Sequence, residues 1–168
     1  QPSNSETIMS YWSTSILGGP QALAALARLE DALELPRGSL YPLDNIDPEL
    51  RDNLTERLQT SFRPIQAALQ EIPRAEAQIG LQVAAALLMA VGARIPPAFR
   101  QRAREAIRKD PFRTEPERAL EMDALARRLA TYRTGRPSPV GEDLLTVATG
   151  KRRLARLPQP YARETVGA

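Results

Sequence analysis

The residues best suited to chemistry in this chain are cations, and many of them follow Pro97 in one short run. The sequence PPAFRQRAREAIRKD carries Glu105 as the only acid before Asp110. Arginine recognises carboxylates and phosphates through paired N–H donors, so the run could bind an anion or an acidic protein. An arginine-rich face that is simply solvated would show the same pattern, and this alternative stays open. The residues predicted to face outward here are Arg100, Arg102, Arg104, Arg108 and Lys109, and all of these except Arg102 are taken as candidate contacts.

A second group of cations lies in residues 151–168, a basic segment that also contains prolines. Lys151, Arg152 and Arg153 are the candidate contacts in this predicted tail. Together with the helix predicted over 97–109, they could give weak nucleic-acid binding that falls steeply with salt and ignores base sequence. The run over 97–109 lacks the interleaved aromatic residues typical of single-strand binders.

Carboxylates are the other groups that could carry a reaction. Glu117, Glu121 and Asp123 lie close together in sequence, but Glu121 and Asp123 are two residues apart and point in different directions on a helix. A metal pair in a helical bundle needs facing carboxylates from two helices. The sequence therefore predicts no metal site and no catalytic residue. A magnesium-dependent hydrolase of nucleotides or phosphoesters is kept as the second alternative function.

The residues that are absent exclude several chemistries. The chain has no cysteine, which excludes disulfides, zinc–thiolate sites and cysteine nucleophiles. It has no histidine, which excludes the Ser-His-Asp triad and imidazole ligands. No cofactor is expected, and the chain is predicted not to be an enzyme.

Charge is divided unevenly along the chain, although the net charge is only +3. Residues 1–58 hold nine acids and four arginines, whereas residues 59–168 hold 19 basic and 11 acidic side chains. Such a division favours a protein partner, self-association or a polyanion partner, although an unevenly charged surface with no role would look the same.

The element that must position these groups is a helix predicted over about residues 73–92. Between Ala77 and Val91 every side chain is apolar or glycine except Gln78 and Gln82, which share one narrow face. A helix that is apolar nearly all round is buried by other helices or by lipid. Fifteen residues reach about 22 Å, short of a hydrocarbon core of about 30 Å, so we expect a core helix and no membrane.

Amphipathic helices are predicted around this centre. One runs over residues 20–35 with Glu30 and Asp31 on its outer side. Another begins after the N-cap Asp47 and is interrupted near Pro64. Further helices are expected over 97–109, from a cap at Thr114 to Gly135, and briefly after Ser138. The predicted fold class is all-α, a compact bundle of about five to six helices.

One helical domain is expected over residues 9–150. Residues 1–8 are interpreted as a disordered extension or an expression remnant, and they carry no apolar run typical of a signal peptide. Trp12, Ile16 and Leu17 are expected to plug one end of the core. The protein is expected to be a cytosolic protein of a bacterium or of its phage.

Three stretches together resemble an uncharacterised family of small bacterial and phage proteins of unknown function. They are Met9-Ser10-Tyr11-Trp12, the helix ALAALARLEDAL and the segment AAALLMAVGARIPP. The likeness covers residues 9–35 and 75–107. The sequence departs from the family at Gly18-Gly19-Pro20-Gln21, where the family has an acidic residue or asparagine. The resemblance implies a helical fold and supplies no catalytic residues.

These observations favour a non-enzymatic interaction module, associated with a phage or mobile element and acting on a host protein. Salt-sensitive nucleic-acid binding is the alternative.

Overall fold

The computed structural model describes residues 17–138, of which 68% are helical, with no strand in that range. This confirms the predicted all-α bundle. The described range does not include several residues named above: Trp12, Ile16, the short helix predicted after Ser138 and the cations Lys151, Arg152 and Arg153. The elements are α2 (Pro20–Ala32), η1 (Leu43–Asn45), α3 (Pro48–Thr60), α4 (Arg63–Gln70), η2 (Arg74–Glu76), α5 (Ala77–Val91), α6 (Pro97–Arg108) and α7 (Pro116–Thr131).

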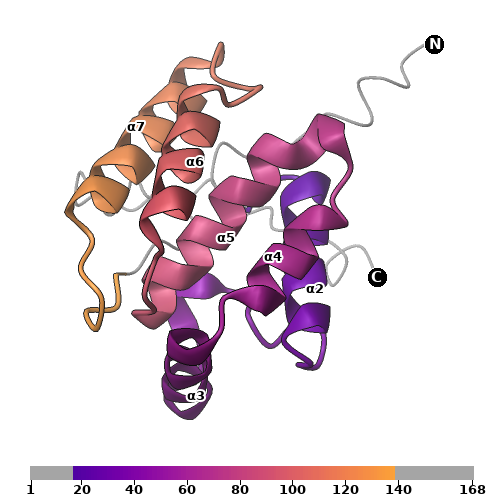
Figure 1. Cartoon of the computed structure of the whole chain (residues 1–168). Coiled ribbons are helices and arrows are strands. Elements are labelled where there is room, and N and C mark those ends of the chain that lie inside the picture. The colour runs from indigo at the N-terminus through magenta and orange to yellow at the C-terminus, as the bar shows by residue number, and fades with distance from the viewer. Residues whose placement is uncertain (1–16, 139–168) are drawn as a thin grey trace.

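Helix α5 is the centre of the bundle, as the sequence predicts. Figure 1 shows α2 and α4 along one side of α5, whereas α6 and α7 lie along the other side. Every residue from Gln82 to Val91 is buried, including Val83 and Leu87 at 0% exposure. Alanines at three successive positions, 84 to 86, let the neighbouring helices approach closely.

The C-terminal end of α5 is held by donors from several other elements. Gly92 takes the left-handed conformation (φ 81°), which a glycine adopts without steric cost, and so ends the helix. Carbonyls at a helix end lack intrahelical partners, and here α3 and the segment after α7 supply them. The contacts are Thr55 Oγ1 to Val91 O (2.6 Å), Tyr132 Oη to Ala93 O (2.6 Å), Ser138 N to Met89 O (2.8 Å) and Gly135 N to Gly92 O (2.9 Å).

Helix α2 ends earlier than predicted, at Ala32, and Glu30 does not face outward. Its carboxylate is buried (3% exposed) and accepts the backbone N–H groups of Gly38 and Leu40 at 3.0 and 2.9 Å. A carboxylate that accepts several N–H bonds offsets the cost of its burial. Glu30 therefore fixes the loop that follows α2.

The interruption predicted near Pro64 is a complete break between α3 and α4. Helix α3 ends at Thr60, and Pro64 occupies the first turn of α4, where a missing N–H costs nothing. Asp47 caps α3 as predicted, accepting the N–H of Leu50 at 3.2 Å.

Helix α7 differs from its prediction at both ends. It begins at Pro116 without a side-chain cap, so Thr114 is not the N-cap, and it ends at Thr131 instead of Gly135. Arg118 and Glu121 are buried in it, at 2% and 0% exposure. Sequence periodicity does not predict the burial of either residue, because a charged side chain in an amphipathic pattern is expected to face solvent.

Within the described range, one stretch is long and apolar enough to cross a membrane. It covers Arg74–Val91 with a mean hydropathy of 1.2, and 72% of it is buried inside the bundle. Burial against other helices is sufficient to account for this composition.

Candidate functional site

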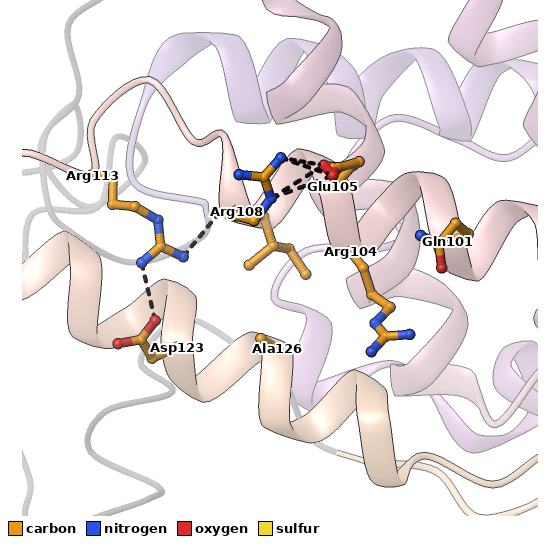
Figure 2. A pocket seen from close by; sticks show the side chains of 8 residues that line it. Gln101, Arg104, Glu105, Arg108, Arg113, Asp123 and Ala126 are labelled. Atoms are coloured by element: carbon orange, nitrogen blue, oxygen red, sulfur yellow. Dashed lines mark hydrogen bonds and ion pairs between the residues drawn. The ribbon is translucent and has the colours of Figure 1, made fainter.

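A shallow groove of about 530 Å³ lies between α6 and α7, and two exposed arginines of the predicted cationic run, Arg104 and Arg108, line it. Figure 2 shows the side chains that surround it. The groove is lined by Gln101, Arg104, Glu105, Ile107, Arg108, Arg113, Asp123 and Ala126, and this set is called the α6–α7 groove below.

The helical repeat of α6 explains which of its side chains reach the groove. Phe99, Ala103, Ala106 and Ile107 are buried toward the core. Gln101, Arg104 and Arg108 then follow at spacings of three and four, which places them in one row on the outer side. Ile107 contributes to the apolar part of the groove together with Ala126 of α7.

Arg108 is paired with Glu105 of the same helix. Its guanidinium donates to both carboxylate oxygens, and the shortest contact joins Nη2 to Oε1 at 2.8 Å. The hydrogen bond with Arg108 lowers the pKa of Glu105, and the same bond raises the pKa of Arg108. Arg108 therefore carries little uncompensated charge into the groove.

Arg113 is held at the other end of the groove. It donates to the Asp123 carboxylate on α7 at 3.0 Å and to the Ile107 carbonyl on α6 at 3.1 Å. Its Nε is buried without a hydrogen-bond partner. Arg113 thus joins the C-terminal end of α6 to α7.

Arg104 differs from both neighbours. It is exposed, and it makes no hydrogen bond or ion pair within residues 17–138. In Figure 2 its side chain extends across the groove toward α7. Because Glu105 and Asp123 balance Arg108 and Arg113, the groove as a whole carries about one positive charge, which belongs to Arg104.

Arg100 does not face outward as predicted. It is half-buried, its guanidinium donates to the carbonyls of Leu129 and Tyr132, and it lies 5.9 Å from the centre of the Tyr132 ring. The donors that made it a candidate contact are used to tie α6 to the end of α7. Lys109 and Arg102 are exposed as expected but do not line the groove.

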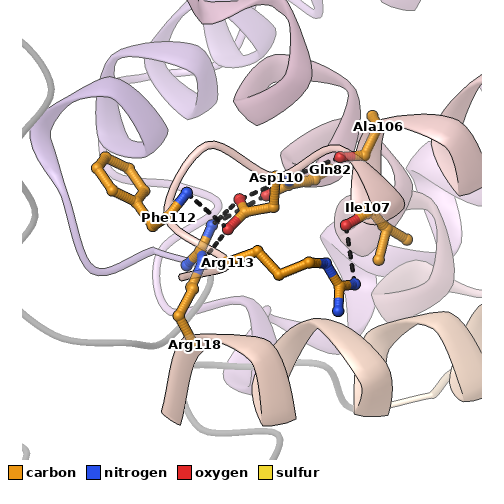
Figure 3. Close-up of polar contacts among 7 residues, drawn as sticks. All are labelled: Gln82, Ala106, Ile107, Asp110, Phe112, Arg113 and Arg118. Atoms are coloured by element: carbon orange, nitrogen blue, oxygen red, sulfur yellow. Dashed lines mark hydrogen bonds and ion pairs between the residues drawn. The ribbon is translucent and has the colours of Figure 1, made fainter. Parts of the chain in front are cut away.

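Below the groove, a buried polar network joins α5, α6 and α7 (Figure 3). The side chains of Asp110 and Arg118 form an ion pair at 2.8 Å and are 0% and 3% exposed. Gln82 donates to Asp110 at 2.9 Å and accepts from Arg118 at 3.1 Å, while the N–H of Phe112 donates to Asp110 at 3.1 Å. The network orients the α6–α7 hairpin on the central helix.

Sequence reasoning missed this network. The signal that could have found it was Gln82, a polar residue in the middle of an apolar helix. A buried amide needs partners, and only charged or polar side chains from another element could supply them.

The acids considered as metal ligands do not converge. Asp123 pairs with Arg113 in the groove, whereas Glu121 is buried. Among residues 17–138 no group of three or more acids is placed to hold a metal ion.

No known protein family, curated protein or solved structure matches this chain.

Proposed function

We propose that the protein is a non-enzymatic interaction module whose α6–α7 groove binds an acidic surface of a polypeptide. The observation that carries the proposal is Arg104, an exposed cation without a partner in the described range, placed beside apolar groove residues. A carboxylate of the bound polypeptide would pair with Arg104 while one of its apolar side chains packs on Ala126 in the apolar part of the groove.

The mixture of charges in the groove favours a polypeptide over a nucleic acid. Nucleic-acid binding draws its affinity from many cations that each neutralise a phosphate. Here Glu105 and Asp123 occupy two of the three groove arginines, and their carboxylates would repel a phosphate backbone. A polypeptide with charges of both signs can instead match such a pattern.

The proposal is tested by comparing two variants in affinity capture. The tagged protein would be exposed to bacterial lysate, because the sequence predicts a bacterial or phage protein. Arg104→Glu reverses the charge in the groove, and Arg63→Glu makes the same change at an exposed position on α4. Cross-linking would locate the contact on each captured protein.

Proteins that bind through the groove should be retained by Arg63→Glu and reduced at least about tenfold by Arg104→Glu, with cross-links to acidic segments. Equal retention by both variants would overturn the proposal. Captured material that is released by nuclease treatment would favour the nucleic-acid alternative instead.

A further inference from the structure

Helix α3 exposes an acidic face that no other described element covers. Glu49, Asp52 and Glu56 are exposed and follow one another at spacings of three and four, so they lie in one row along the helix. The helix buries only Leu54 and Leu58, and Figure 1 shows it at one end of the bundle. These three residues are called the acidic α3 face below.

The charges of this face are largely uncompensated within the described range. Glu49 and Glu56 make no ion pair there, and the contact of Asp52 with Arg51 is a long one of 3.8 Å between exposed side chains. Such a pair contributes little. The face is therefore available to an external cation.

The acidic α3 face and the α6–α7 groove are complementary in charge and in spacing. The groove presents Gln101, Arg104 and Arg108 in one row at the same spacings of three and four. Two helices lying side by side could thus bring Arg104 opposite a carboxylate while Arg108 keeps its Glu105 partner. Within one copy α3 does not lie against the groove, because it is held at the C-terminal end of α5, where Thr55 donates to the Val91 carbonyl (Figure 1).

We propose that the α6–α7 groove of one copy receives the acidic α3 face of a second copy, so that the protein associates head to tail. This inference rests on the proposed function, since it names one acidic surface that the groove accepts. Each contact leaves one groove and one acidic face free, so assemblies grow with concentration. A copy that fills the groove also blocks it for any other acidic partner.

The test is sedimentation velocity of the full chain over a range of protein concentrations. The mean mass should rise with concentration at low salt and return toward the monomer in about 0.5 M salt, where charges are screened beyond roughly 4 Å. A monomer at every concentration at low salt would overturn the proposal.

Two variants and a control identify the surfaces. Glu56→Arg and Arg104→Glu should each raise the dissociation constant at least about tenfold. Glu71→Arg, at an exposed position beyond α4, should leave it within about twofold. Association that is unaffected by Glu56→Arg or Arg104→Glu would contradict the proposed contact.

Mixing the two variants gives a further check on the head-to-tail arrangement. Each variant retains the surface that the other has lost, so the mixture should associate more tightly than either variant does alone. A mixture that remains monomeric would contradict the arrangement.

The experiments separate this inference from the proposed function. If the chain is monomeric but captures acidic proteins in a manner that depends on Arg104, the self-association is wrong and the interaction module stands. If Arg104→Glu affects neither property, both fail.

Discussion

At the scale of single residues, arginine has three different roles in this protein. Arg118 is buried and compensates Asp110, Arg100 is half-buried and ties α6 to the end of α7, and Arg104 is exposed without a partner in the described range. The planar guanidinium supports all three roles, because its several donors can satisfy carbonyls and carboxylates in fixed directions. What differs is the number of acceptors that the fold places around each one.

The buried pair should make Asp110 important for stability. Asp110→Ala removes the carboxylate that pairs with the buried Arg118 guanidinium at 2.8 Å. We expect a loss of about 3–5 kcal/mol in the free energy of unfolding, measured by urea denaturation.

Asp123→Ala is the control for this change, because it removes an ion pair whose side chains are 31% and 51% exposed. It should cost less than about 1 kcal/mol. Similar losses for the two variants would show that the buried network does not stabilise the fold.

Tyr132 should make stability depend on alkaline pH. Burial raises its pKa from 10.0 to about 12, against a smaller opposing effect of Arg100. The folded state favours the neutral phenol, so this contribution is complete below pH 10 and is lost as the pH rises toward about 12. The free energy of unfolding should therefore fall through this range.

Tyr132→Phe provides the comparison. It should be less stable by about 1 kcal/mol at neutral pH, where the hydrogen bond to Ala93 is lost. Its stability should then fall less steeply with pH than that of the unaltered protein. Parallel curves from denaturation at several pH values would contradict this assignment.

At the scale of elements, helix ends decide how the bundle is joined. The last carbonyls of α5 are bound by α3 and by the segment after α7, so one helix end connects parts of the chain far apart in sequence. These bonds at the C-terminal end of α5 contribute to stability because unpaired buried carbonyls are costly.

Two glycines of similar backbone conformation allow the helix end to be tested. Gly92 and Gly135 have φ values of 81° and 86°, but a Cβ at Gly92 would lie 3.1–3.3 Å from Pro137 whereas one at Gly135 would meet nothing within 4 Å. An alanine at either position should cost about 1–2 kcal/mol in backbone strain. Gly92→Ala should cost more, as thermal denaturation would show, and equal losses would mean that the Pro137 contact relaxes freely.

At the scale of the whole molecule, α5 separates two oppositely charged halves of the described chain. Residues 17–93 hold ten acids and six basic side chains, and residues 94–138 hold twelve basic side chains and six acids. Helices α2 and α4 lie on one side of α5, and α6 and α7 lie on the other. The division of charge along the sequence therefore becomes a division of charge in space. This separation makes docking between the halves of two molecules electrostatically favourable.

The shared core predicts that one substitution in α5 affects the entire bundle. Leu87 is 0% exposed, so Leu87→Asp buries an unpaired charge at a cost of several kcal/mol and should unfold the domain. Circular dichroism should show the loss of helix.

Arg104→Asp changes charge on the surface and should alter the free energy of unfolding by no more than about 0.5 kcal/mol. A folded Leu87→Asp protein, or an unfolded Arg104→Asp protein, would contradict the assignment of core and groove.

Local sequence patterns were enough to predict the central helix and several of the places where helices begin, break or end. The apolar run around Leu87, the break near Pro64, the cap at Asp47 and the stop at Gly92 all follow from local rules of helix formation. Those rules act over one or two turns, so the residues that obey them are close together in the chain.

Which charged groups are available for binding depends on packing between helices, and no local pattern predicts it. Glu30 and Arg118 are buried, the Arg100 guanidinium donates to backbone carbonyls, and Arg104 remains exposed. Periodicity alone predicts that the arginines of α6 all face solvent. The cost of burying a charge depends on the acceptors and donors around it. For Arg118 and Arg100 these come from positions between 8 and 36 residues away, and no local pattern contains them.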